Sequence, residues 1–489
     1  MIRRIFTLLL AFLLILIGIL LLNTFRAKPW PRYSVTNTEL LLPDSAIIHM
    51  SRAIQIPTIS ISDTSMIDTA AYRKFASFLE QAYPLIHQKL SKTIINTFSY
   101  IYEWKGQNAS FAPIVLMGHY DVVPVEQVVI GKWTVPPFSG AITDTCIWGR
   151  GAADDKSSVI SILEGTEAML RRGFVPQRTI YLCFGHDEEI SGKGADAIVR
   201  YFEQKKIRPE MVLDEGGEIT IQNATEFSRP IAVIGVAEKG YASYELIVEK
   251  AGGHSSIPAK ETSIDILAAA LYKLRTTESA ARLTPQLTEF LNRVGSSSNK
   301  FINRLAAANM WLFEGQVKKI VEKEPEGYAM THTTIVPTII ESGIKDNVVP
   351  TRAKAIVNSR ILTGETTKSV EDYIRKVISD DRVTIKLMGK MGTDPSAATS
   401  SGSPAFKRVE SALSKIVPDV IPSPYQMVGA TDSRFYRRIS DGIVNFFPMT
   451  DAKGYHGIDE RIPILDLKRG IHFVQTIISE SDSIFLKSK

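Results

Sequence analysis

The sequence predicts an α/β fold whose core is a mixed, largely parallel sheet. Three short apolar runs, 114–117, 180–184 and 211–213, are bounded by glycine and polar residues. Runs of this kind are typical of strands buried on both faces, as in parallel sheets. Imidazole or acidic groups follow each run, at the edge where open α/β sheets build their sites. About 460 residues follow the apolar N-terminus, which is enough for two domains.

Residues 1–28 are predicted to form a transmembrane signal anchor. The run 5–22 is apolar apart from Thr7 and Gly18, and with three further residues it just spans a hydrocarbon core of about 30 Å. A cleaved signal peptide is the alternative, but its apolar region is roughly 7 to 15 residues long and ends at a small-residue cleavage site. Residues 23–26 offer no such site. We therefore expect a single-pass membrane protein, or a secreted one if the segment is cleaved.

Basic residues flank this segment on both sides, with Arg3 and Arg4 before it and Arg26, Lys28 and Arg32 after it. Because the two sides nearly match, the positive-inside rule does not fix the orientation.

A helix is predicted after Asp154 and Asp155, because Val159, Leu163 and Leu170 recur at helical spacing. The two aspartates could therefore be no more than an N-terminal cap. A residue that caps a helix can also bind a metal. Whether the two aspartates do so is judged from the other acidic segments of the chain.

Five short segments bring imidazole or acidic groups together: 118–121, 151–156, 187–189, 214–217 and 454–457. Singly, each motif is more often a solvated loop or a surface pair. Together they offer two histidines, a set of carboxylates and no cysteine, which is what a pair of hard-to-borderline divalent ions recruits. No Gly-x-Ser-x-Gly elbow offers a different nucleophile.

A second domain is predicted from alternating strands and helices. The strand-like runs are 231–236, 241–248, 354–361 and 383–387, and the helical stretches are 263–274 and 369–378. The pattern suits a small sheet covered on one face by helices.

Residues 280–330 are predicted to be a helical enlargement of this second domain. Leu287, Phe290, Leu291 and Val294 form one apolar stripe. The stripe either packs on the second domain or walls an apolar substrate pocket.

Composition sets bounds on the function. The net charge is +5, from 57 basic and 52 acidic residues without a long basic block, so nucleic acid is not an expected partner. Two cysteines do not make a disulfide framework.

Four motifs carry a resemblance to a known family: 118–124, 148–156, 252–256 and 303–313. From about Leu40 to about Ile478 the chain resembles the zinc aminoacylase/carboxypeptidase family, which includes glutamate carboxypeptidase, desuccinylase and aminoacylase. The last motif is most similar to the branch of carboxypeptidase S and N-fatty-acyl-amino-acid synthase/hydrolase. The resemblance implies a di-zinc aminopeptidase/carboxypeptidase-like catalytic domain at 35–239 and 391–489. An α+β lid/dimerisation domain would be inserted at 240–390.

The resemblance also implies two zinc ions per chain, with cobalt or manganese as alternatives. The implied metal ligands are His119, Asp154, Glu189, Asp214 and His456. Asp154 would bridge the ions, and its peptide bond to Asp155 would be cis. Glu188 would be the general base, and Asp121 would hold the imidazole of His119 in place.

Five further residues match family positions near the substrate. His254 would stabilise the oxyanion, in another subunit or in its own. Asn347 and Arg360 would contact the substrate, Arg360 as a bidentate partner for a free carboxylate. Gly429 and Thr431 belong to a glycine-rich substrate loop.

The expected function is a membrane-anchored, extracytoplasmic metal-dependent hydrolase. It would cleave the amide bond of N-acyl amino acids or C-terminal peptide bonds, and it could form a homodimer through the lid. A broad-specificity dipeptidase is the alternative within enzymes. A non-catalytic binding protein for acyl amino acids is the alternative from another class, although pure binding has no use for Glu188.

Overall fold

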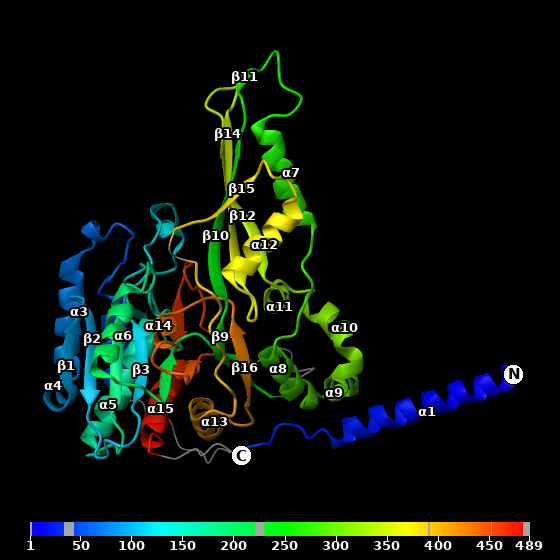
Figure 1. Ribbon diagram of the computed structural model, residues 1–489. Helices are drawn as coiled ribbons and strands as arrows, with labels where there is room; N and C mark the ends of the chain where they lie inside the picture. The colour runs from blue at the N-terminus through cyan, green and yellow to red at the C-terminus, as the bar shows by residue number, and fades with distance from the viewer. Residues whose placement is uncertain (1, 34–43, 221–228, 390–391, 451, 483–489) are drawn as a thin grey trace.

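The computed structural model describes residues 2–33, 44–220, 229–389, 392–450 and 452–482, and it consists of an α/β body, an upright second sheet and a long N-terminal helix (Figure 1). The helices are α1 (Ile2–Arg26), α2 (Asp44–Ile54), α3 (Thr69–Ala82), α4 (Pro84–Lys89), α5 (Lys156–Arg171), α6 (Lys193–Lys205), α7 (Ser263–Thr276), α8 (Pro285–Ser296), α9 (Phe301–Ala308), α10 (Met310–Val321), α11 (Pro325–Thr331), α12 (Thr367–Ile378), α13 (Pro404–Ile416), α14 (Ser433–Tyr436) and α15 (Ile464–Ser479).

The strands form one large sheet and three smaller ones. The large sheet contains β1 (Ser91–Ile95), β2 (Ser99–Trp104), β3 (Ile114–His119), β6 (Ile180–Gly185), β7 (Met211–Asp214), β8 (Ile219–Thr220), β9 (Ile231–Glu238), β16 (Ile421–Met427) and β17 (Ile443–Asn445). The smaller sheets contain β4 (Ala141–Ile142), β5 (Cys146–Trp148) and β18 (Arg461–Pro463); β11 (Gly253–His254) and β13 (Val348–Val349); and β10 (Gly240–Glu249), β12 (Thr334–Ser342), β14 (Arg352–Ile361) and β15 (Thr384–Leu387).

The large sheet confirms the predicted fold class. Its order is β1-β2-β6-β3-β7-β17-β9-β16, and β8 pairs with β9. The pairs of β3 with β6 and β7, of β17 with β7, and of β16 with β9 are parallel, whereas β1 and β2 form an antiparallel edge. The three apolar runs are β3, β6 and β7, the central parallel strands.

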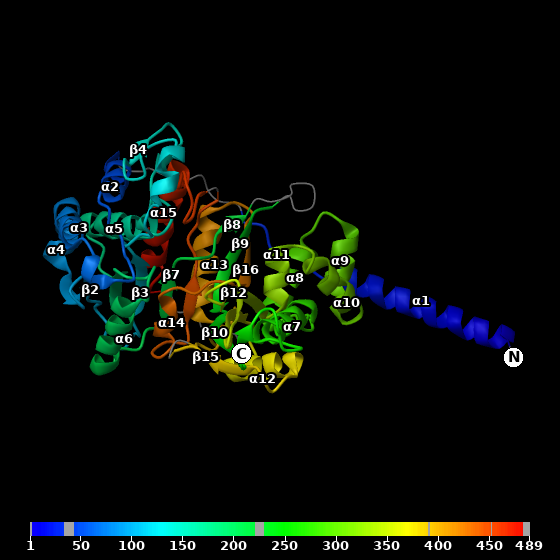
Figure 2. The same cartoon turned by 90° about the horizontal axis from the view of Figure 1, so that it is seen from above.

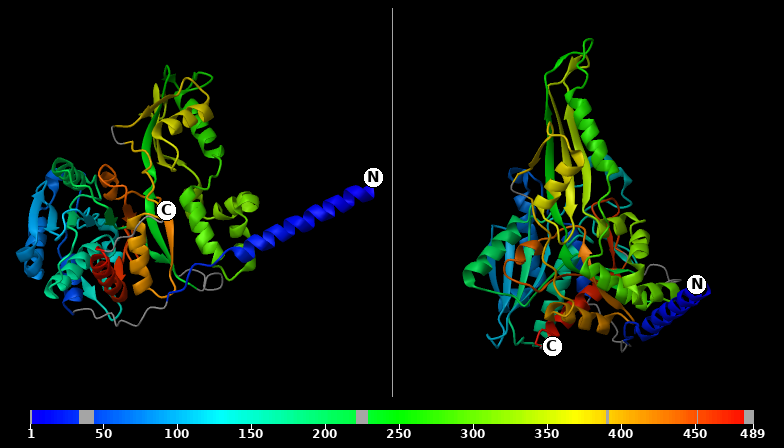
Figure 3. Two further views of the ribbon diagram at one scale, coloured as in Figure 1. Left: turned by 60° about the horizontal axis from the view of Figure 1, so that its bottom comes forward. Right: turned by 45° about the vertical axis from the view of Figure 1, so that its right-hand side comes forward.

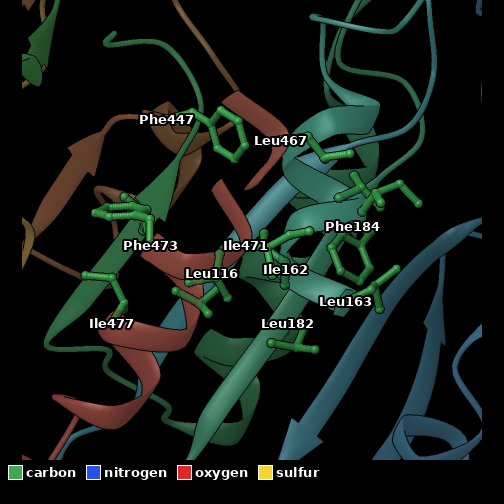
Figure 4. Packing of buried hydrophobic residues seen from close by; sticks show 14 of the residues in the cluster. Leu116, Ile162, Leu163, Leu182, Phe184, Phe447, Leu467, Ile471, Phe473 and Ile477 are labelled. Atoms are coloured by element: carbon green, nitrogen blue, oxygen red, sulfur yellow. The ribbon is translucent and has the colours of Figure 1, made fainter. Parts of the chain in front are cut away.

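Each central strand is buried on both faces, as its composition predicts. Leu116 and Leu182 pack against α5 and α15 on one face (Figure 4). Val115 and Cys183, one residue along each strand, join the α6 cluster on the other face. Alternate side chains of each strand point to opposite faces, and helices cover both faces. Polar groups can therefore lie only at the strand ends.

The second sheet is built from residues 240–387 in the order β12-β14-β10-β15, with all pairs antiparallel. Helices α7 and α12 cover one face, and the sheet stands above the body (Figure 3). The run 231–236 becomes β9 in the large sheet instead. Strand β12 was not predicted; it contains Pro337, and the ladder is irregular there, as proline confined to an edge strand allows.

The stripe on α8 does not pack on the second sheet, which was one of its two expected roles. Val294 packs with Ile231 and Ile421, and Phe290 adjoins them. These residues of the stripe therefore cover the β9–β16 edge of the large sheet rather than the second sheet. Figure 2 shows α8 to α10 between the body and α1.

Helix α1 is long and apolar enough to cross a membrane, with a mean hydropathy of 3.2 over its most apolar window. That window is not buried against the rest of the protein. In Figure 1 the helix runs away from the body.

Candidate metal centre

The predicted site residues meet at one edge of the large sheet. His119 ends β3, the segment 187–189 follows β6, and Asp214 ends β7. Because these strands are parallel neighbours, their carboxyl ends lie side by side. The topology thus gathers groups that are far apart in the sequence.

Asp154 lies between the two histidines. Its Oδ1 is 3.0 Å from Nε2 of His119 and its Oδ2 is 3.0 Å from Nε2 of His456. Nε2 of His456 is also 3.2 Å from Oε2 of Glu189. One carboxylate with an imidazole on each oxygen is the arrangement of a ligand that bridges two ions.

Glu215 completes the group around His119. Its Oε1 lies 3.2 Å from Nε2 of His119, the same nitrogen that faces Asp154. His119, Asp155 and Glu215 also form a set whose ligand atoms lie within 4.8 Å of one another. The sequence prediction assigned this place to Asp214, the preceding residue, but the geometry assigns it to Glu215.

Asp214 is turned into a buried polar network instead. Its Oδ2 accepts hydrogen bonds from Thr431 Oγ1 at 2.7 Å and from the Ser433 N–H at 3.0 Å. Thr431 also contacts Glu238 and receives a hydrogen bond from Asn445. Thr431 is buried and holds Asp214 in place, and its contact with substrate stays a prediction.

Asp121 organises two parts of the site at once. Its Oδ1 lies 3.2 Å from Nδ1 of His119, and Ser60 donates to its Oδ2 at 2.7 Å. The backbone N–H groups of Glu188 and Glu189 both donate to Asp121 at 3.2 Å. The carboxylate thus orients an imidazole and fixes the loop that carries the other acids, which extends its predicted role.

Asp155 occupies the N-cap position of α5, but its side chain does not cap the helix. It precedes α5 but makes no capping hydrogen bond, and the His119 N–H donates to its Oδ2 at 3.3 Å. The Asp154–Asp155 peptide bond is cis, as the resemblance implies.

Glu460 is a functional residue that the sequence did not reveal. It is fully buried, and its Oε1 accepts hydrogen bonds from the N–H groups of Ala153 and Asp154 at 2.9 and 3.1 Å. Arg150 holds its other oxygen at 2.6 Å. The only sequence signal is an acidic residue shortly after His456.

The pKa values of the site residues are shifted because several acidic side chains are buried close together. Burial raises the pKa of Glu215 to about 7 and that of Glu188 well above its ordinary value, although His119 opposes both shifts. Hydrogen bonds to Asp154 and Glu189 raise the pKa of His456 to about 10. Such an excess of buried acid is the setting in which cations bind.

The donor set fits divalent ions. It contains imidazole nitrogens and carboxylate oxygens, the ligands that zinc, cobalt and manganese accept. The Oε1 atom of Glu189 is buried without a hydrogen-bond partner. Two ions sharing Asp154 would be held by His119 and Glu215 on one side and by Glu189 and His456 on the other.

The remaining predicted residues lie outside this cluster. His254 is exposed in β11, which pairs with β13 at the tip of the lid and lies far from the strand ends that carry the ligands (Figure 1). Asn347 accepts a backbone hydrogen bond from Ser255 at the same tip. Arg360 lies on β14 with its guanidinium over the ring of Tyr241. Gly429 is half-buried beyond β16.

Comparisons place this architecture among known proteins. Residues 115–480 match the model of peptidase family M20/M25/M40. The chain is 38% identical over 489 residues to the protein named Probable carboxypeptidase S-like 2 of Dictyostelium discoideum, covering 96% of this chain and 93% of that protein. It is 32% identical over 438 residues to the human N-fatty-acyl-amino acid synthase/hydrolase PM20D1, covering 88% and 86%.

Solved structures share the fold. An M20 family metallo-carboxypeptidase from Sulfolobus solfataricus matches with a TM-score of 0.65 and 19% identity, over 90% of this chain and all (100%) of that one. The YXEP protein of Bacillus subtilis, described as a dinuclear metal-binding peptidase, matches with a TM-score of 0.55 and 13% identity, over 89% and 99%.

The choice between Glu215 and Asp214 can be tested by metal content. Glu215→Gln should lower the number of metal ions bound per chain, because it removes a charged group that faces His119. Asp214→Asn keeps the shape of the buried network and should retain both ions, with affinity weakened by about 10- to 100-fold at most. Elemental analysis of desalted, folded protein measures the ratio. Loss of an ion from Asp214→Asn alone would restore the original assignment.

Proposed function

Because the chain belongs to peptidase family M20/M25/M40 and is therefore a metal-dependent hydrolase, we propose that it holds two zinc ions and cleaves amide bonds of N-acyl amino acids or C-terminal peptide bonds. The observation that carries the proposal is Asp154, whose two carboxylate oxygens each face one histidine at 3.0 Å. A single structural ion would have no need of such a shared ligand.

Glu188 is the proposed general base. It sits beside the ligand Glu189, and among the described residues it forms an ion pair with Arg434 at 4.0 Å. Asp121 fixes the Glu188 backbone, so the carboxylate is aimed from a rigid loop. Two divalent ions bound in the cluster would polarise a carbonyl and activate a water as nucleophile. Glu188 would take the proton and return it to the leaving amine.

The substrate class is proposed from the relatives and from the lid. The two curated relatives are named for carboxypeptidase and fatty-acyl-amino-acid activities, and both substrate classes carry a free carboxylate. Arg360 would offer its guanidinium to such a group. Asn347, at the lid tip beside His254, would offer its amide to the site of a partner subunit. A broad-specificity dipeptidase is the alternative. The di-peptidase Dug1p of Saccharomyces cerevisiae shares the fold, with a TM-score of 0.60.

Replacing Glu188 tests the mechanism. Glu188→Gln keeps the shape and removes the base, so turnover should fall by about 10² to 10⁴ while metal content stays normal. The control Glu203→Gln changes an acid on the partly exposed outer side of α6 and should leave turnover unchanged. Hydrolysis of N-fatty-acyl amino acids and of dipeptides is measured with zinc supplied. Full turnover in Glu188→Gln would contradict its role as base.

We propose a homodimer through the lid. Strand β12 is an edge strand, and Val336, Ile339 and Ile340 expose apolar side chains on it. Within one chain His254 lies at the lid tip, away from the metal centre. Pairing of two lids would give His254 a route to the partner's site, where it could stabilise the oxyanion.

Mixing two inactive variants tests this arrangement. His254→Ala should lower kcat by about 10² to 10³ without loss of metal. Chains carrying His254→Ala mixed with chains carrying Glu188→Gln should regain part of the activity, because hybrid dimers contain one complete site. Fluorescent labels confirm that subunits exchange. Exchange without rescue would place His254 in the site of its own chain.

We also propose that α1 remains attached as a membrane anchor with the enzyme outside the cytoplasm. Thr24 is buried, and Asn309 donates hydrogen bonds to Leu20 O at 3.1 Å and to Thr24 Oγ1 at 3.3 Å. Cleavage after this segment would remove these two hydrogen bonds together with the helix that helps to bury Asn309. The extracytoplasmic side rests on the exported relatives that the resemblance implies.

The anchor is tested by extraction. Full-length protein should stay with membranes through high-salt and alkaline washes, because its insertion is hydrophobic rather than electrostatic. N-terminal sequencing should find the first residues still present. A mature N-terminus near Lys28 would show that the segment is a cleaved signal.

A further inference from the structure

We propose that helices α9 and α10 form a surface that rests in the interface of a phospholipid bilayer, beside the anchor. This surface, the α9–α10 surface, is defined by Phe301, Ile302, Trp311, Leu312 and Ile320, all of which are exposed. The inference rests on the proposed role of α1 as an anchor, and it goes beyond that role by assigning a second membrane contact to the folded enzyme.

The first observation is a fixed joint between α1 and α9. Asn309, which follows α9, bonds Leu20 O and Thr24 Oγ1, and its own Oδ1 accepts from Asn23 Nδ2 at 2.9 Å. The rings of Phe25 and Phe301 lie 6.5 Å apart. The C-terminal end of α1 therefore packs against α9 and is not joined to the body by a flexible linker alone.

The second observation is that the chain after α1 is also fixed. Arg229 donates to Trp30 O at 2.7 Å and to Pro31 O at 2.8 Å. The Trp30 N–H donates to Ser297 Oγ at 3.0 Å, and the guanidinium of Arg293 lies 4.3 Å from the centre of the Trp30 ring. The chain just after α1 is thus held against the body, and α9 and α10 are the part of the body nearest the free length of that helix (Figures 1 and 3).

The third observation is the composition of the surface. Neither α9 nor α10 contains a buried residue, although both are rich in apolar side chains. Trp311 is 62% exposed, Ile302 60% and Ile320 64%. Residues 300–323 carry five basic and two acidic side chains. Apolar and aromatic groups mixed with lysine and arginine suit the headgroup region of an anionic bilayer.

The length of α10 decides how it meets the membrane. At 12 residues it is too short to span a hydrocarbon core, so it would lie in the plane of the interface with its apolar side chains inserted. A bilayer is the favoured occupant because the surface is continuous with a helix that is itself apolar enough to cross one. A second copy of the chain would not account for that continuity.

Depth-dependent quenching tests the inference on the full-length chain. An accessible cysteine is introduced by Ile302→Cys or Ile320→Cys in a Cys146→Ser background, in which the other cysteine, Cys183, is buried. It is labelled with an environment-sensitive fluorophore, and the protein is reconstituted into vesicles of phosphatidylcholine and phosphatidylglycerol. Nitroxide-labelled phosphatidylcholine should quench both labels and their emission should shift to the blue. Leu14→Cys, within α1, is the positive control. Ile257→Cys, which replaces an 85% exposed side chain on the lid, should not be quenched.

The outcomes separate the proposals. Quenching at position 14 with none at 302 and 320 would overturn the inference and leave the anchor intact. No quenching at position 14 would overturn both. Disulfide cross-links between two 302 positions without lipid quenching would identify an interface between copies and overturn the bilayer assignment. Metal content and amide hydrolysis of the same preparations report on the enzyme independently.

Discussion

The site depends on one carboxylate shared between two imidazoles. Asp154 can face both His119 and His456 only if its backbone is fixed, and Glu460 fixes it through two N–H groups. Two further acids, Glu189 and Glu215, are brought within 3.2 Å of the same nitrogens. So many buried acids are costly without positive charge. Hydrogen bonds with the surrounding Asp121, Ser60, Thr431 and Asn445 hold the site's side chains in position against the mutual repulsion of the acids.

Local sequence was enough to predict the centre of the fold. The apolar runs that became β3, β6 and β7 are short, fully buried and flanked by glycine, and their polar neighbours follow at once. The structure places Glu215 beside His119 where the sequence prediction put Asp214, a difference of one residue. Successive side chains at a strand end point in opposite directions, so composition cannot tell which member of an Asp-Glu pair faces the cluster. Only the contacts of Thr431 and Ser433 with Asp214 decide it.

Other features depend on contacts between distant segments. Glu460 acts on residues some three hundred positions earlier, and no local pattern reveals such a pairing. The sequence showed the apolar stripe on α8 but not the surface against which it packs, because any apolar surface could cover such a stripe. Strand β12 was hidden by Pro337, a residue that argues against a central strand and is tolerated at an edge. The joint of Asn309 with Leu20 and Thr24 likewise lies beyond local sequence.

The fixed joint at Asn309 limits the symmetry of any dimer. A two-fold axis relates every part of one subunit to the same part of the other, including the direction of its helix α1. Two rigidly attached anchors can enter the same bilayer only if that axis stands along the membrane normal. An axis lying in the membrane plane would send the two anchors in opposite directions and bridge two facing membranes. The direction in which the edge of β12 meets its copy would therefore decide between an enzyme that works on one membrane and one that holds two together.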